Sequence, residues 1–260
     1  MPGRRGARVE DPGRWVFNRL AGAYASRPGY PEVLVERLEA LAGPRGRVVD
    51  LGAGTGDLAL PLASRGLRVA AVEPARRMLD ALERRLPEGG ATSALVQPVH
   101  AAAESTGLPP ASFDLALVAD ALHWLDPERA GEEIARLLSP AGTVAVVEVE
   151  PRPSPFLDVL WPRLHAANSR ARPRAPDLRG PRRQLLALAA PGAEPRAETF
   201  DTDEALAPEA AAGVVASLSF AGAALSPATL TSLAAWTEER ARAGEARWRR
   251  RLHLRWVRRR

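Results

Sequence analysis

The sequence predicts an α/β fold built on a largely parallel, doubly wound sheet. Residues 48–73 have the pattern of a strand, a glycine-rich turn, a helix and a second strand, with a carboxylate at the tip of that second strand. Short apolar segments then alternate with helical segments as far as residue 150. Because parallel strands need crossover connections, the alternation indicates right-handed βαβ units in a Rossmann-like sheet.

Local signals place the elements of the first half. Pro31 opens a helix that ends at Gly43, since proline suits the first helical turn and glycine the residue after the last one. Short apolar runs between turns predict strands, and apolar residues three and four apart predict helices. The strands are placed at 47–51, 67–73, 93–99, 113–120 and 143–150, and further helices at about 56–65, 75–86 and 127–138.

The pattern is weaker in the second half. Proline and arginine are dense between residues 151 and 195, around a short helix at 155–167. The rest predicts a strand at 196–203, helices at 208–220 and 227–244, and a strand at 251–257. In that last segment Leu252, Leu254 and Trp256 alternate with polar residues, which is the period of a strand. We therefore expect the arginine-rich end to form an edge strand of the sheet rather than a disordered arm.

The composition limits the possible functions. The chain has 260 residues, no cysteine and no lysine, so its 36 basic residues are all arginine and its formal net charge is +5. Arginine in place of lysine is typical of a GC-rich bacterial genome. Without an 18-residue apolar run or a secretory signal, no membrane span is expected and the cytoplasm is the expected compartment. No metal site is expected, because His100, His165 and His253 lack ligand spacing.

Three glycines follow Asp50 in the pattern D-x-G-x-G-x-G, at Gly52, Gly54 and Gly56. Dinucleotide enzymes use G-x-G-x-x-G, so the third glycine comes one residue early for a pyrophosphate. The motif resembles the cofactor loop of class I S-adenosylmethionine-dependent methyltransferases, in particular their small-molecule "type 11" branch. The resemblance implies a seven-stranded sheet with an antiparallel last strand, S-adenosyl-L-methionine as cofactor and S-adenosyl-L-homocysteine as product.

The first cofactor contacts are expected at the ends of the first two strands. By the resemblance, Asp50 and the loop residues Gly52, Ala53 and Gly54 hold the methionine end. Glu73 stands 19 residues after Gly54, where an acidic side chain accepts hydrogen bonds from ribose hydroxyls.

Two residues of the next segment are further candidates. Pro74 is expected to set the turn after the second strand. Met78 suits one face of the purine, and packing in the core is an equal alternative for it.

The loop after the third strand resembles the family segment that meets the adenine edge. Ala103 and Glu104 match the usual Ala-Glu pair, whereas Ala102 stands where the family commonly has an aspartate. The carboxylate that would accept from the adenine amino group is therefore missing. Backbone groups near Ala103 or the side chain of Glu104 are the expected replacements. A solvated charge or a helix partner is the alternative for Glu104.

The segment after residue 113 resembles the part of the family that faces the transferred methyl group. Ala119 and Asp120 are placed at the carboxyl end of the fourth strand, where ligands bind in open α/β sheets. His123 follows them and is our candidate general base or substrate-orienting group, since histidine exchanges protons near pH 7. A structural histidine is the alternative.

The aromatic N-terminal segment resembles the family's lid. There Tyr24 and Arg27 are expected at the amino-acid end of the cofactor, and Tyr30 at the acceptor; packing on the sheet is the alternative for each. We expect residues 1–14 to be disordered and 15–260 to form one methyltransferase domain. Its parts are a lid and helix (15–45), a cofactor-binding core (46–150), an insertion over the active face (151–195) and C-terminal strands and helices (196–260).

The predicted function is methyl transfer from S-adenosylmethionine to a small-molecule acceptor, such as a secondary metabolite. An RNA or tRNA methyltransferase is an alternative, but the aromatic platforms typical of single-strand binding are absent. A non-catalytic adenosylmethionine-binding partner protein is another. A nicotinamide oxidoreductase lacks the later glycine. We expect a monomer or homodimer with no nucleic-acid or membrane partner.

Overall fold

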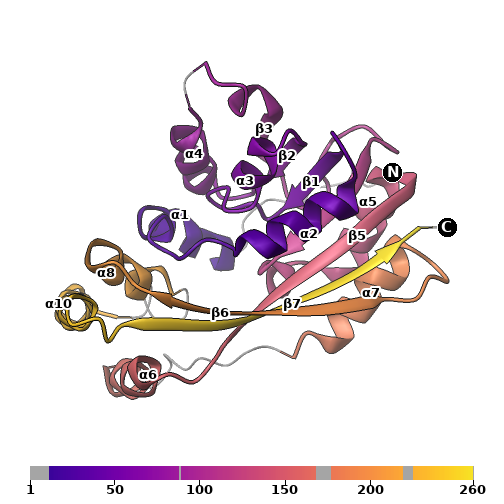
Figure 1. Cartoon of the computed structure of the whole chain (residues 1–260). Coiled ribbons are helices and arrows are strands. Elements are labelled where there is room, and N and C mark those ends of the chain that lie inside the picture. The colour runs from indigo at the N-terminus through magenta and orange to yellow at the C-terminus, as the bar shows by residue number, and fades with distance from the viewer. Residues whose placement is uncertain (1–11, 88, 168–176, 219–224, 260) are drawn as a thin grey trace, which may run out of the picture.

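The computed structural model describes residues 12–87, 89–167, 177–218 and 225–259. Within these residues, seven strands form one sheet in the order β3-β2-β1-β4-β5-β7-β6 (Figure 1). The strands from β3 to β5 run parallel, and β7 runs antiparallel to both of its neighbours. The predicted α/β fold, with a mostly parallel sheet of seven strands and an antiparallel last strand, is confirmed.

The element bounds are as follows. The strands are β1 (Arg47–Leu51), β2 (Arg68–Val72), β3 (Val96–Val99), β4 (Phe113–Ala119), β5 (Leu138–Pro151), β6 (Arg196–Ala205) and β7 (Arg247–Arg258). The α-helices are α1 (Pro12–Tyr24), α2 (Glu32–Ala42), α3 (Ala59–Ser64), α4 (Arg76–Arg85), α5 (Pro127–Leu137), α6 (Pro155–Ala167), α7 (Arg179–Ala189), α8 (Pro208–Ser217) and α10 (Pro227–Arg242). Two 3-10 turns are η1 (Ser93–Leu95) and η2 (Leu122–Trp124).

Several boundaries differ from the sequence prediction, among them the start of β3 at Val96 rather than residue 93 and the start of β7 at Arg247 rather than residue 251. Helix α3 begins at Ala59 rather than near residue 56, because Gly56 has a φ of +86°, which a right-handed helix does not include. Strand β5 begins at Leu138 rather than at residue 143, since Leu138 still pairs with Phe113 across a register shift.

The parallel strands are buried on both faces, which explains their continuous apolar runs. On one face Val48, Leu115 and Ala145 pack with residues of α2 and α3. On the other face Val49 and Val146 pack with residues of α5 and α7. The helices therefore cover both sides of the sheet, and only the strand ends remain open for a ligand.

The strand order reverses at β1, which lies between β2 and β4. A crevice forms outside the carboxyl ends of the strands at such a switch point. Asp50, Glu73 and Asp120 all stand at this edge, at the ends of β1, β2 and β4. The topology thus brings three carboxylates from distant parts of the sequence to one end of the sheet.

The arginine-rich last strand is internal, so our expectation of an edge strand is wrong. Strand β7 pairs with β5 on one side and with β6 on the other, and β6 is the edge. Leu252 and Leu254 are fully buried. On the opposite face Arg251 pairs with Asp201, and Arg247 and Arg249 pair with Asp203. Carboxylates of β6 thus neutralise the basic strand, and the acidic β6 completes the sheet.

A third apolar cluster lies where β6 and β7 extend beyond the parallel strands (Figure 1). It joins Phe156, Leu160, Val214, Leu233 and Trp248, from α6, α8, α10 and β7. The rings of Phe156 and Trp236 stack at 5.6 Å. The C-terminal half therefore forms its own helical layer beside the carboxyl edge of the sheet.

The segment 151–195 is only partly the insertion that we expected over the active face. Helix α6 is confirmed, but the sequence pattern missed α7. Leu185, Leu186 and Ala189 of α7 are buried against the core of the sheet, so this helix mainly covers a sheet face. Part of the expected insertion, residues 168–176, lies outside the described residues.

The expected disorder of residues 1–14 is corrected for residues 12–14, which belong to α1 because the helix begins at Pro12. Residues 1–11 lie outside the described residues. Further along α1, Phe17, Ala21 and Tyr24 pack with Ala75 and Met78 of the α4 region. Within the described part of the chain, no helix combines the length and apolar character needed to cross a membrane.

We predict that Leu254→Ala lowers the free energy of unfolding by about 2–5 kcal/mol, because it leaves a cavity in a central strand. Arg251→Ala removes an exposed ion pair and should cost under about 1 kcal/mol. Urea denaturation monitored by circular dichroism measures both changes. Equal effects of the two substitutions would contradict the burial of Leu254 on the core-facing side of β7.

Candidate active site

The turn after β1 forms the floor of a cleft at the carboxyl edge of the sheet. Backbone N–H groups of Gly52 and Ala53 donate to the Val72 carbonyl, at 2.9 and 3.0 Å, which holds the turn against β2. Gly52 has a φ of +80°, and a Cβ there would lie 2.7 Å from the Cβ of Ala121. Gly54 has a φ of +56°, and its missing Cβ would meet no heavy atom within 4 Å. The turn therefore needs glycine and leaves room for a ligand above Gly54.

Glu73 connects the glycine turn to the start of α4. Its Oε2 accepts a hydrogen bond from Gly54 N at 3.0 Å, and its Oε1 accepts one from Ala75 N at 2.8 Å. The side chain is buried but lines the cleft. Spacing alone placed this carboxylate correctly at the tip of β2, beside the glycine turn.

Asp50 is a second buried carboxylate in the same place. Burial, together with the negative charges of Glu73 and Asp57, raises its pKa to about 7. Two neighbouring carboxylates without a cation favour a protonated form of one of them. A ligand that brings positive charge to this end of the cleft would relieve the repulsion.

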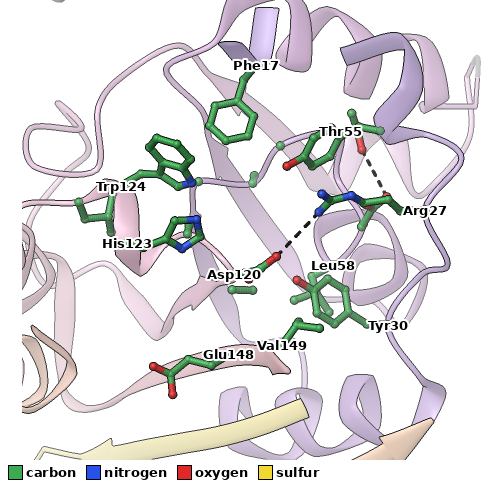
Figure 2. Close-up of a pocket in the computed structure, with 18 of the residues that line it drawn as sticks. Phe17, Arg27, Tyr30, Thr55, Leu58, Asp120, His123, Trp124, Glu148 and Val149 are labelled. Carbon is green, nitrogen blue, oxygen red and sulfur yellow. Dashed lines mark hydrogen bonds and ion pairs between the residues drawn. The ribbon is translucent and has the colours of Figure 1, made fainter. Parts of the chain in front are cut away.

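The connection between α1 and α2 closes one side of the cleft (Figure 2). Arg27 Nε donates to Ser217 Oγ at 2.9 Å, and its Nη1 lies 3.8 Å from Asp120 Oδ2. The guanidinium also lies 4.1 Å from the centre of the Tyr24 ring. Burial raises the pKa of Tyr24 to about 12, and that of Tyr30 well above its ordinary value. Both phenols therefore stay neutral and keep a donor at the wall of the cleft.

The opposite wall contains the end of β4 and η2. Asp120 has a φ of +48°, which turns the chain as it leaves the strand, and its N–H donates to the Val147 carbonyl at 2.8 Å. Figure 2 shows Asp120, His123 and Trp124 around one opening. Phe17 meets Trp124 edge to face, with ring centres 5.0 Å apart. Aromatic groups from α1 and η2 thus cover the opening of the cleft.

His123 is exposed at the mouth of the cleft, and partial desolvation by the groups around it lowers its pKa from the ordinary value of 6.5. The nearby Asp120 charge opposes this shift, and the Arg27 charge adds to it. The imidazole is therefore neutral at pH 7 and can accept or donate one hydrogen bond.

The structure brings nearly all predicted site residues into this cleft, which has a volume of about 1060 Å³. Those that line it are Tyr24, Arg27, Tyr30, Asp50, Gly52, Ala53, Gly54, Glu73, Pro74, Met78, Ala103, Ala119, Asp120 and His123.

Glu104 is the exception. It does not line the cleft, and its Oε1 accepts from Asp126 N at 3.0 Å, just before α5. This hydrogen bond agrees with the alternative expectation of a helix partner, and an adenine contact of Glu104 stays a prediction.

Sequence reasoning missed the far end of the cleft. Glu148 and Glu150 of β5, Trp248 and His253 of β7, and Trp161 of α6 line it there. Ligands bind at the carboxyl ends of the strands in open α/β sheets, which is the rule that identified Asp50 and Glu73. The carboxylates at the end of β5 stand at the same edge, so this rule could have predicted them as well. The contributions of α6 and β7 carried no such signal, since they depend on how the C-terminal half folds back. Within the described residues, no group of three or more His, Asp or Glu side chains is arranged to hold a metal.

Comparisons with known proteins find methyltransferases. A family model described as "Methyltransferase domain" matches residues 49–146. An uncharacterised methyltransferase of Mycobacterium tuberculosis is 45% identical over 132 residues, which cover 50% of this chain and 51% of that protein. This match therefore spans about half the length of that curated relative.

Solved structures resemble the chain over most of its length. One is a structure from Anaeromyxobacter dehalogenans, provisionally described as a type II methyltransferase, which is 28% identical with a TM-score of 0.61. The match covers 90% of this chain and 97% of that chain. The [4+2]-cyclase SpnF is 19% identical with a TM-score of 0.56, covering 94% of this chain and 92% of its own, which shows a shared fold alone.

The sheet topology, the glycine turn and the matched family model define residues 49–146 as a methyltransferase domain. Over these residues the chain matches the methyltransferase-domain family, and its curated relative in Mycobacterium tuberculosis is similar over about half of its length.

We predict that Asp50→Asn increases stability at pH 8 relative to the wild type. Between the unfolded pKa of 3.8 and the folded pKa of about 7, the folded protein holds a proton that the unfolded chain has lost. Wild-type stability therefore falls across this range, by about 1.4 kcal/mol for each unit of pKa shift, and the neutral amide escapes the loss. Urea denaturation at pH 5 and pH 8 tests this, with Asp80→Asn, at a half-buried carboxylate of α4 that pairs with Arg76, as control. An unchanged difference between the two pH values would contradict it.

We also predict that His123 titrates below 6.5, which NMR of the histidine Cε1–H signals measures directly. Asp120→Asn should lower this pKa further, because it removes the negative charge that opposes the shift. Arg27→Gln should raise it, because it removes a nearby positive charge. Shifts in the opposite directions would place His123 away from both groups.

Proposed function

We propose that this protein transfers the methyl group of S-adenosylmethionine to a small-molecule acceptor. The observation that carries the proposal is one cleft in which the Asp50, Gly54 and Glu73 cradle continues into a second, aromatic and polar end. A single space with two chemically different ends suits a donor and an acceptor held in line. The match to the methyltransferase family over residues 49–146 supports the donor assignment.

The residues at the first end fit the cofactor. Asp50 and the backbone of Gly52 and Gly54 would hold the methionine part, whose ammonium group offsets the paired negative charges. Glu73 would accept from the ribose hydroxyls, and the space that a Cβ at Gly54 would occupy is open. Apolar contacts with the adenine would come from Met78 and Ala103, which are buried at the wall of the cleft.

The bound cofactor supplies an activated methyl group on a positively charged sulfur. The protein's part is to align the acceptor and exclude water, which is the main source of catalysis in such a displacement. Phe17 and Trp124 cover the opening, and Tyr24 and Arg27 close its side. His123, neutral at pH 7, is placed to orient the acceptor through one hydrogen bond.

A small acceptor is favoured over RNA by the state of the arginines. Arg247, Arg249 and Arg251 of β7 each pair with a carboxylate of β6. Arg250 is buried and donates to the Pro28 and Gly29 carbonyls, at 3.0 and 2.7 Å. Phosphate binding at these four residues would have to break existing pairs, so the basic composition does not make an open phosphate track.

The test is calorimetric titration with S-adenosylhomocysteine. We expect wild-type binding and an affinity at least tenfold weaker in Glu73→Ala, because hydrogen bonds to a charged group contribute about 1.5–3 kcal/mol each. Glu73→Gln keeps the side-chain shape and should be intermediate. Glu83→Ala removes an exposed carboxylate of α4 and should bind as the wild type does.

Two results would count against the proposal. No binding to the folded wild type would reject the methyltransferase function. Equal affinity of the wild type and Glu73→Ala would reject the proposed register of the cofactor in the cleft.

A further inference from the structure

A histidine–carboxylate pair lies at the far end of the cleft, away from the cofactor cradle. His253 Nε2 lies 2.9 Å from Glu150 Oε2, and both residues line the cleft. His253 of β7 is directly opposite Glu148 of β5, and Glu150 is two residues further along β5. Side chains two residues apart share a face of a strand, so the three groups point to the same side of the sheet.

The pair determines which ring nitrogen of His253 carries the proton. The hydrogen bond from His253, followed by that from Arg152, lowers the pKa of Glu150, so this group is a carboxylate at neutral pH. A carboxylate only accepts hydrogen bonds, hence the neutral imidazole must carry its hydrogen on Nε2. Nδ1 then holds the lone pair, and no hydrogen bond from the described residues reaches it. This arrangement presents a base to the cleft.

The strand register places this base near the expected reaction centre. Ala119, the last residue of β4, pairs with Val147 of β5, and Val147 pairs with Leu254, the neighbour of His253. Adjacent strands lie about 4.8 Å apart, so the end of β4 and the His253 backbone are separated by about 10 Å. An acceptor the size of one or two rings would fill this interval. Figure 2 shows the Glu148 side chain on the same side of the opening as His123.

The walls of the cleft indicate what kind of acceptor fits. Trp161 and Trp248 meet edge to face, with ring centres 6.2 Å apart. Trp248 lies on the other face of β7 from His253, and the two rings give the same cleft an apolar wall that suits a ring. Arg182 pairs with Glu148, and Arg152 pairs with Glu150 at 3.1 Å. Each of these two carboxylates already has a guanidinium partner, so the pairs hold no net negative charge that would favour a cationic amine over a neutral hydroxyl group.

We propose that His253, oriented by Glu150, is the general base that deprotonates the hydroxyl group of an aromatic acceptor. The inference rests on the methyl-transfer function proposed above and adds the class of acceptor. His123, which lacks an orienting carboxylate hydrogen bond among the described residues, remains the positioning group nearer to β4.

The step is balanced without another reactant. The acceptor O–CH3 bond forms as the S–CH3 bond breaks, and the electron pair of that bond stays on sulfur. The hydroxyl proton moves to Nδ1 of His253, and Glu150 stabilises the resulting imidazolium. The proton passes to water when the product leaves.

Other charged groups also face His253. Glu148 and Glu150 come from β5, Asp201 from β6, Arg251 and Arg255 from β7, and Arg182 from α7, with Arg152 just beyond β5. The experiment therefore needs a control on the same face of the sheet. Asp201→Asn changes the charge of that face outside the cleft lining and serves this purpose.

The test uses 4-nitrophenol as the probe and the whole chain saturated with S-adenosylhomocysteine. The absorbance of the nitrophenolate reports the ionisation of the bound probe during a pH titration. We expect its apparent pKa to fall by about one unit or more on binding, because the proton moves to His253 and leaves an opposite charge nearby. The shift should disappear in His253→Gln, decrease in Glu150→Gln and persist in Asp201→Asn.

Each outcome decides the matter. Failure of the wild type to bind S-adenosylhomocysteine overturns the methyl-transfer function and this inference with it. Cofactor binding without binding or ionisation of the probe overturns the inference alone. A shift that survives in His253→Gln and is lost in His123→Gln assigns the base to His123 instead. Loss of the shift in Asp201→Asn attributes it to the general charge of the face and also overturns the inference. Unchanged affinity for S-adenosylhomocysteine confirms that each variant is folded.

Discussion

The rest of the site depends on two buried carboxylates held at the ends of adjacent strands. Asp50 and Glu73 cannot move apart, because β1 and β2 are paired up to Leu51 and Val72, and Glu73 is bonded to the glycine turn and to α4. Burial, together with the negative charge of Glu73, raises the pKa of Asp50 to about 7. The fold thus maintains a local excess of negative charge. A cationic ligand would reduce this excess, so its binding would stabilise this edge of the sheet.

The reversed strand β7 completes the other end of the cleft. It places His253 opposite Glu148 on one face, while the buried Arg250 on the other face donates to the Pro28 and Gly29 carbonyls. The same strand therefore contributes a polar group to the cleft and anchors the segment that carries Arg27 and Tyr30. Antiparallel insertion of the last strand between β5 and β6 explains how residues more than 200 positions apart meet in one site.

Individual residues show why some expectations succeeded and others failed. Spacing alone placed Glu73. A tight turn, a helix of ordinary length and a strand allow little variation in the number of residues between the glycine turn and the end of β2. Glu104 accepts a hydrogen bond from Asp126 N just before α5, a contact between loops that spacing along the chain does not reveal. The last strand had the correct period but the wrong neighbour: alternation reports two faces and is the same for an edge strand and an internal one.

The sequence by itself determined the class of fold, the glycine turn, the two carboxylates of the cradle and the candidate residues of the N-terminal segment. These depend on local rules of turn geometry, strand period and the position of strand ends. Only the tertiary structure decided that β7 lies inside the sheet, that α7 covers one face of it, and that His253 and Glu150 form a pair in the cleft. Those outcomes depend on pairing between distant strands and on burial of the C-terminal helices, for which a linear pattern holds no distance information.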